Sequence, residues 1–251
     1  MAASPTASLI VIGNEILSGR TIDANIQFLA AALGKLGIPL VEVRVIPDIE
    51  IDIITAVNAL RVRTTYVFTT GGIGPTHDDI TAASIAKSFG VELARHQSSV
   101  EKMERQYGDR LNEARLKMAY LPEGSAPIET RVTSAPGFCI DNVYVMAGVP
   151  SIARAMFDVI APSLARGAPV LSRFVEAHMG EGDLADALTN IQATYPTVDV
   201  GSYPFFRSGQ IGMSIVAKGT DAAEIDKVIS CVEKAINACG KSCSVDKEIS
   251  S

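Results

Sequence analysis

The sequence predicts an α/β protein in two parts: a three-layer sandwich with a mostly parallel sheet, and a small α+β module that follows it. Three observations support this prediction. Strand-like and helix-like segments alternate through the first half of the chain, and three glycines follow the third strand-like segment. A Gly-Pro boundary then precedes a strand-rich segment with a different order of elements. Alternation of strands and helices is typical of a parallel sheet covered on both faces.

Six segments carry the alternation in the first half of the chain. Residues 9–12 form a short apolar run that ends at Gly13, as a buried strand does, and residues 14–20 are expected to form a polar loop. Apolar residues then recur at helical spacing until Gly37, which ends the helix. The later segments are a strand over 40–46, a helix over 53–60, a strand over 66–68 and a helix over 81–89.

The middle of the chain is expected to be more helical. Segments 100–107 and 111–120 carry mixed charges, which is typical of solvated helix faces. Two apolar runs, 138–140 and 143–146, predict paired strands joined by a turn. Pro150 suits the first turn of a helix that runs to about residue 165.

The domain boundary is predicted at residues 166–169, where Gly and Pro together mark a loop. We expect a first domain over 9–168 and a second over 169–240, with flexible tails at 1–8 and 241–251. The second domain is predicted to contain strands over 170–177, 198–203 and 210–217 and helices over 184–193 and 222–238.

Charge and composition exclude several classes of protein. The 251 residues carry 22 basic and 28 acidic side chains, a net charge of −6, whereas nucleic-acid-binding proteins usually present a basic stripe. No apolar stretch reaches the roughly 18 residues of a membrane span. The residues before Leu9 lack the basic side chains of a secretory signal. We therefore expect a cytoplasmic protein with no nucleic-acid partner and no membrane partner.

The cysteines do not predict a zinc site. None of the four, Cys139, Cys231, Cys239 and Cys243, stands in a Cys-x-x-Cys spacing, and the chain has three histidines. We expect reduced thiols, as in most cytoplasmic proteins.

The strongest functional signal is segment 70–81, TGGIGPTHDDIT, which lies between a predicted parallel strand and a predicted helix. Gly71, Gly72 and Gly74 allow a ligand to approach the backbone closely. The helix that follows directs its N–H groups at the same crevice. The segment is neither a Walker A loop nor a Gly-x-Gly-x-x-Gly motif. Its position predicts a phosphate or anion site, with a plain tight turn as the alternative.

The adjacent carboxylates Asp78 and Asp79 add a metal to this prediction. One of them is explained as a helix cap, but two carboxylates beside a phosphate would repel it. A divalent cation between the carboxylates and the phosphate oxygens removes that conflict, and hard oxygen ligands suit Mg²⁺. His77 is either a further ligand or an exposed loop residue.

Other carboxylates follow the first two predicted strands. Glu15 and Asp23 come after the first strand, and Asp48 comes after the second. Because the carboxyl ends of parallel strands meet at one edge of a sheet, these residues are expected to form one acidic crevice with Asp78 and Asp79.

Several segments of the sequence resemble the molybdopterin-binding (MoCF) domain, over about residues 9–165. They are GNEILSGR at 13–20, DAN at 23–25, Asp48, the glycine segment 70–81, APGF at 135–138 and GVP at 148–150. The most similar branch is that of the competence/damage-inducible protein A (CinA) proteins, which carry this domain at the N-terminus. GEGDLA at 180–185 extends the resemblance more faintly into the small module.

The resemblance implies a molybdopterin-binding α/β fold followed by a KH-like or ferredoxin-like module, in a protein that is usually a homo-oligomer. In the wider family the glycine loop and acidic residues bind molybdopterin or its adenylylated form with Mg²⁺. The CinA branch is associated with metal-dependent hydrolysis of nucleotide diphosphates such as ADP-ribose, and a eukaryotic relative fused to FAD synthase can hydrolyse FAD.

Carried over to this sequence, the resemblance implies three groups of site residues. Asp48 and Asp79 are expected to be catalytic. Asp23, Asp78 and Asp79 are expected to hold a divalent cation, Mg²⁺, Mn²⁺ or Co²⁺. The residues expected to contact phosphate or nucleotide are Gly71, Gly72, Gly74, Thr76, Thr81, Asn25, Pro136, Gly137, Gly148 and Pro150.

The sequence departs from the family pattern in three places. Asn14 stands where the family usually has Asp, which removes one carboxylate. Thr133-Ser134 stands where the branch usually has Gly-Thr, so that loop is expected to differ. The nicotinamide-nucleotide amidase domain of long CinA proteins has no counterpart in these residues, so no amidase activity is expected.

Three functions remain open at this point, all with a phosphorylated small molecule as ligand. The first is a metal-dependent hydrolase of a nucleotide diphosphate linkage. The second is molybdopterin binding or adenylyl transfer in molybdenum cofactor biosynthesis. The third is a nucleotide-binding sensor without catalysis.

Overall fold

The computed structural model describes residues 4–207 and 209–246. The chain forms two compact units, Met1–Gly167 and Ala168–Ser251, which meet in the Gly-Pro segment. Each unit has its own hydrophobic core. None of the described helices is long and apolar enough to cross a membrane.

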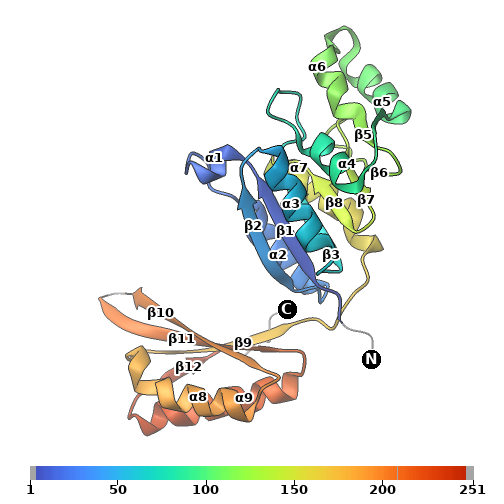
Figure 1. Cartoon of the computed structure of the whole chain (residues 1–251). Coiled ribbons are helices and arrows are strands. Elements are labelled where there is room, and N and C mark those ends of the chain that lie inside the picture. The colour runs from blue at the N-terminus through green and yellow to red at the C-terminus, as the bar shows by residue number, and fades with distance from the viewer. Residues whose placement is uncertain (1–3, 208, 247–251) are drawn as a thin grey trace. The chain divides into compact units, whose positions relative to one another are not determined.

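The first unit is built on a six-stranded sheet with the order β2-β1-β3-β8-β7-β6 (Figure 1). Its first four strands in that order are parallel, and β7 and β6 continue the sheet antiparallel. The strands are β1 (Ala7–Ile12), β2 (Leu40–Ile46), β3 (Tyr66–Thr70), β6 (Ala126–Ile128), β7 (Gly137–Ile140) and β8 (Val143–Met146). The predicted mostly parallel sheet is confirmed.

Helices cover both faces of this sheet because β1 is apolar on both sides. Leu9 and Val11 pack with α2 (Asn25–Lys35) and α7 (Pro150–Ile160). Ile10 and Ile12, which alternate with them, pack with α3 (Glu50–Arg61) and α4 (Thr81–Phe89). A strand buried on both faces is typical of a parallel sheet in a three-layer sandwich.

Two short segments differ from the prediction. Residues 14–17 form a one-turn helix, α1 (Asn14–Leu17), instead of starting an irregular loop. The expected helix over 111–120 is wrong. The side chain of Asn112 accepts a hydrogen bond from the Arg115 N–H and so begins a new one-turn helix, α6. The chain then turns into a strand at Tyr120.

The helical segment 97–119 lies between two paired strands, β4 (Leu93–Arg95) and β5 (Tyr120–Pro122). It has a small core of its own, made by Val100, Met103 and Ala119. Its elements are α5 (Gln97–Tyr107), η1 (Gly108–Arg110), α6 (Glu113–Leu116) and η2 (Lys117–Ala119).

The second unit is a four-stranded antiparallel sheet, β10-β11-β9-β12, with two helices packed on it. Its elements are β9 (Leu171–Ala177), η4 (Glu181–Leu184), α8 (Ala185–Thr194), β10 (Asp199–Arg207), β11 (Gln210–Gly219), α9 (Ala222–Ala238) and β12 (Cys243–Val245).

Both expected tails are shorter than predicted. Strand β1 begins at Ala7, and β12 pairs with β9 within the segment expected to be a tail over 241–251. Both differences arise because a few residues pair through their backbone groups. The pattern of side chains over so few residues does not predict such pairing. Residues 1–3 and 247–251 lie outside the described residues.

Candidate functional site

The candidate site lies at the carboxyl ends of the parallel strands β1, β3 and β8. The chain leaves β1 towards β2 on one side and leaves β3 towards the strands on the other side, so the connections diverge between β1 and β3. Ligands in open α/β sheets bind at such a switch point. A pocket of about 600 Å³ is found there. Its lining includes Glu15, Thr21, Gly71, Gly72, Gly74, Asp79, Tyr107, Arg115, Met118, Thr133, Gly148 and Pro150.

The glycines at the end of β3 are required by the close approach of the backbone. Gly71 has φ 104°, and a Cβ atom there would lie 2.0 Å from the carbonyl oxygen of Ile12 in the neighbouring strand. Gly72 has φ 66°, and a Cβ atom there would lie 2.2 Å from Thr81 Oγ1. A side chain at Gly71 would therefore displace β1, and one at Gly72 would displace Thr81.

Thr81 stabilises the loop that follows β3, residues 71–74, which we call the glycine loop. Its hydroxyl donates to the Gly71 carbonyl at 3.0 Å, and its backbone N–H donates to the Gly72 carbonyl at 3.0 Å. The side chain is fully buried and is not part of the pocket lining. Thr81 was predicted to contact phosphate, but its two hydrogen bonds in the structure stabilise the glycine loop.

Asp79 lies in the pocket and also shapes the loop. Its Oδ2 accepts hydrogen bonds from the Thr76 N–H at 2.8 Å and from the Thr76 hydroxyl at 2.5 Å. A Cβ atom at Gly74 would lie 2.6 Å from the same oxygen, so Gly74 leaves room for this carboxylate.

Asp78 is exposed and lines neither this pocket nor the smaller one described below. The nearby polar side chain of Thr76, and then its own backbone N–H, lower the pKa of Asp78 below its ordinary value. The neighbouring His77 ring is almost completely exposed, with Nδ1 3.9 Å from Asp78 Oδ1.

The predicted acidic crevice does not form as a single cluster. Within the described ranges, no three Asp, Glu, His or Cys side chains come together as a metal site. Asp23 Oδ1 accepts from the Ile26 N–H at 2.7 Å at the start of α2, and Asp48 Oδ2 accepts from the Asn14 N–H at 2.9 Å. These carboxylates satisfy helix and loop N–H groups, which explains why they remain apart. Glu15 and Asp79 both line the pocket.

The remaining predicted residues lie at different depths around the site. Gly148 and Pro150 line the large pocket. Asn25 is buried behind them, where its Nδ2 donates to the Gly148 carbonyl at 2.9 Å, while its Oδ1 has no partner among the described residues. Gly137 is buried in β7, and Pro136 lines a second, smaller pocket.

The second pocket, of about 260 Å³, adjoins the first. The two share Gly72, Ile73, Gly74, Asp79 and Met118 in their linings. The rest of the smaller pocket is mainly apolar, with Leu93, Leu121 and Phe138, and it includes one basic side chain, Lys117. The glycine loop therefore borders both pockets.

Part of the pocket lining consists of residues that the sequence did not single out. Tyr107, Arg115 and Met118 come from the helical segment 97–119, where mixed charges indicated only a solvated surface. Arg115 Cζ lies 5.1 Å from the centre of the Tyr107 ring, and its guanidinium donates to the Arg110 carbonyl. Arg115 is the basic residue of the large pocket lining. No pattern in the sequence distinguishes it from the neighbouring charges.

The architecture and this site define a class of protein. Residues 8–166 match the family described as probable molybdopterin binding domain, and residues 169–240 match the middle domain of FAD synthase. The first match covers more than half of the chain, so the chain belongs to the molybdopterin-binding (MoCF) domain family.

Individual relatives place the chain more closely. It is 36% identical over 228 residues to a protein of Aeropyrum pernix, a match that covers 86% of this chain and 84% of that one. It is 31% identical over 242 residues to a competence-damage inducible protein of Streptococcus gordonii, covering 92% of this chain and 57% of the relative. The crystal structure of CinA from Thermoplasma acidophilum matches with a TM-score of 0.61 and 32% identity, over 64% of this chain and 98% of that one. The resemblance to the CinA branch is confirmed.

Proposed function

We propose that the pocket of the first unit binds a nucleotide diphosphate of the ADP-ribose or FAD type and hydrolyses its diphosphate linkage with the help of a divalent cation. The observation that carries the proposal is that Asp79, the glycine loop and Arg115 all line the same pocket. The match of the second unit to the FAD synthase middle domain supports a nucleotide ligand.

The donor set of the pocket fits a hard divalent cation. Mg²⁺ in phosphate-binding sites is usually held by one or two carboxylates together with substrate phosphate oxygens and water. Asp79 and Glu15 are the pocket carboxylates, so Asp79 is the proposed ligand with Glu15 available nearby. Such a cation supplies charge neutralisation at the phosphates and lowers the pKa of a bound water.

The chain's own residues would bind and orient the diphosphate. Gly71 and Gly72 would let phosphate oxygens approach the backbone. The Arg115 guanidinium, which lines the same pocket, would pair with a phosphate group of the ligand. Asp79 is proposed to position the attacking water, and Asp48, which is close to Gly72 and accepts from the Asn14 N–H, is proposed to support the loops beside it.

Product analysis tests the proposal directly. Purified protein incubated with ADP-ribose or FAD and Mg²⁺, Mn²⁺ or Co²⁺ should release AMP. Asp79→Asn should lower the rate by about 10²–10⁴ while the protein stays folded. Asp158→Asn, on an exposed position of α7, is the matched control and should leave the rate unchanged. Absence of AMP with every metal would refute hydrolysis.

The match over residues 8–166 favours a second candidate, molybdopterin binding or adenylyl transfer in molybdenum cofactor biosynthesis. It uses the same pocket with a pterin phosphate as ligand. A fluorescent pterin that co-purifies with the protein would support it. Tight binding of ADP-ribose without turnover would instead support the non-catalytic sensor.

A further inference from the structure

Strand β2 forms the outer edge of the sheet in the first unit, and it exposes a row of valines. Val41, Val43 and Val45 are 56%, 37% and 36% exposed, on one face of the strand. An apolar edge strand is a template for pairing with another chain, which most proteins prevent. The register of β2 with β1 shifts between Leu40 and Glu42, so the regular part of this edge is residues 42–46. This edge therefore needs a physical explanation.

The backbone N–H and C=O groups of Val43 and Val45 point away from the sheet. The Ile46 carbonyl accepts from the Gly13 N–H at 3.1 Å, so the polar groups of Ile46 face β1. Backbone direction alternates along a strand, so the N–H and C=O groups of Val43 and Val45 face outward. No strand of the described ranges pairs with this side of β2.

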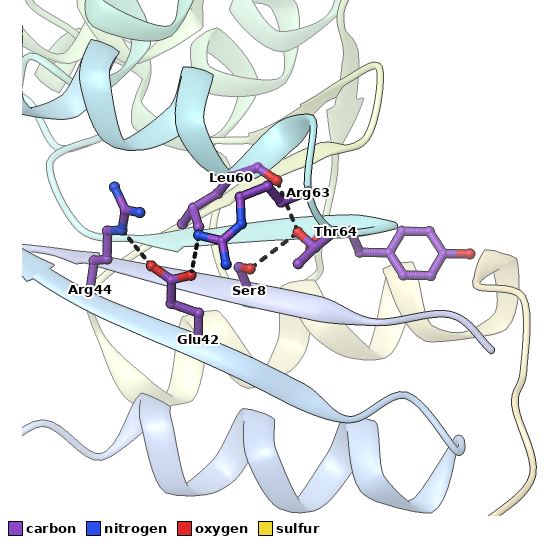
Figure 2. A network of polar contacts seen from close by, with 7 residues as sticks. Ser8, Glu42, Arg44, Leu60, Arg63 and Thr64 are labelled. Atoms are coloured by element: carbon purple, nitrogen blue, oxygen red, sulfur yellow. Dashed lines mark hydrogen bonds and ion pairs between the residues drawn. The ribbon is translucent and has the colours of Figure 1, made fainter. Parts of the chain in front are cut away.

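The charges between the valines form a self-complementary pattern. Glu42 accepts from Arg44 at 2.8 Å and from Arg63 at 3.0 Å on the other face of the strand (Figure 2). The Arg44 guanidinium holds the pKa of Glu42 below its ordinary value, so this carboxylate is charged at neutral pH. The strand therefore reads Val-Glu-Val-Arg-Val, with opposite charges placed symmetrically about Val43.

We propose that β2 is an interface for a second copy of this chain, which pairs antiparallel to it about a twofold axis at Val43. Val43 then lies opposite the partner's Val43, and Val41 opposite the partner's Val45. Glu42 lies opposite the partner's Arg44, and the reverse pair forms by symmetry.

Charge selects this register over its neighbours. A twofold axis at residue 42 would place Glu42 opposite a second Glu42, and an axis at residue 44 would oppose two arginines. Like charges directly opposite each other on paired strands are destabilising. A strand of a different protein would need the same order of an acidic and a basic residue to match β2. A second copy of this chain has that order because its sequence is identical.

The pairing joins two sheets through a short ladder of backbone hydrogen bonds centred on Val43. The contact is small compared with standard interfaces of about 1,600 Å². Association is therefore expected to depend on protein concentration within the micromolar range.

Light scattering on the full chain tests the proposal. At high micromolar concentration the mass should be twice the 26.5 kDa of one chain. Val43→Pro removes only the outward N–H group, which proline tolerates at a sheet edge, and it should give a monomer. Val43→Thr keeps both the N–H group and a β-branched side chain, and it should remain a dimer.

A charge exchange tests the register and remains informative if Val43→Pro fails to fold. Arg44→Glu opposes two carboxylates and should weaken association at least tenfold. The double variant Glu42→Arg, Arg44→Glu restores opposite pairs across the axis and should dimerise again. A wild-type protein that stays monomeric overturns the proposal, as does a dimer whose mass is unchanged by both Val43→Pro and Arg44→Glu. Circular dichroism verifies the fold of each variant.

Discussion

The two walls of the large pocket are built by different means. The glycine loop is a backbone wall, whose shape is set by positive φ angles, by the close approach to Ile12 and by the hydroxyl of Thr81. The second wall consists of the side chains of Tyr107, Arg115 and Met118, from the helical segment 97–119, which has a small core of its own. Substitutions in the first wall should therefore affect folding, and those in the second should affect ligand binding.

The largest effect is expected for Gly71→Ala. The new Cβ atom would lie 2.0 Å from the Ile12 carbonyl oxygen at a positive φ, so the loop or β1 must move. We expect a loss of about 3 kcal/mol or more in the free energy of unfolding. Urea denaturation measures it.

The control for this variant is Gly34→Ala in α2, where a Cβ atom meets nothing within 4 Å. A helical alanine should raise the free energy of unfolding by about 0.5–1 kcal/mol. Equal effects of the two substitutions would contradict the description of the glycine loop as a backbone wall.

The next effect is expected for Arg115→Ala, on the side-chain wall. Loss of a charged donor to phosphate should cost about 1.5–3 kcal/mol, or roughly tenfold to more than a hundredfold in affinity for ADP-ribose. The melting temperature should change little. Calorimetry should also show a weaker salt dependence of binding than in the wild type.

Arg105→Ala, an exposed position on α5, is the matched control for charge. If it lowers affinity as much as Arg115→Ala does, the effect comes from net charge and the side-chain wall has no specific role in binding.

A smaller effect is expected for Thr81→Val, which nearly preserves shape and removes the donor to the buried Gly71 carbonyl. The free energy of unfolding should fall by about 1 kcal/mol. Thr81→Ser keeps the hydroxyl and is expected to lose less. The order of the two melting temperatures distinguishes the hydrogen bond from packing.

The smallest effect concerns alkaline pH. Burial, followed by the neighbouring Cys139, raises the pKa of Tyr144 from 10.0 to about 12. The Tyr144 ring stacks on Phe68 of β3, with 5.3 Å between the ring centres. Because the pKa is raised in the folded state, the neutral ring contributes stability that is fully present below pH 10 and is lost as the pH rises towards 12. Ultraviolet titration should show a late-titrating tyrosine that Tyr144→Phe removes. A titration unchanged by this substitution would contradict the assignment.

The difference between the walls also explains what the sequence could predict. The glycine loop was predictable because its signal is local: an apolar strand, three glycines and a helix within about 25 residues. Arg115 was not, since its place in the pocket depends on how the helical segment 97–119 packs between β4 and β5. Mixed charge at helical spacing looks the same on a solvated face and beside a ligand.

The carboxylates show a second reason for the limits of prediction. Strand order correctly placed Asp79 at the carboxyl edge of the sheet. It did not indicate that Asp23 and Asp48 would be engaged by the N–H groups of Ile26 and Asn14. A hydrogen bond between a carboxylate and a nearby backbone N–H competes with the gathering of several carboxylates in one site. Which of the two occurs depends on side-chain geometry that residue type alone does not reveal.

The short strand β12 has a consequence for the second unit as a building block. Because β12 pairs antiparallel with β9, with Cys243 opposite Ala177 and Val245 opposite Val175, the chain enters and leaves this unit along adjacent strands. Modules whose two ends are neighbours tolerate transplantation into the loops of other proteins. The first and last described strands of this unit are therefore neighbours, which is the arrangement that insertion of a domain into a loop requires.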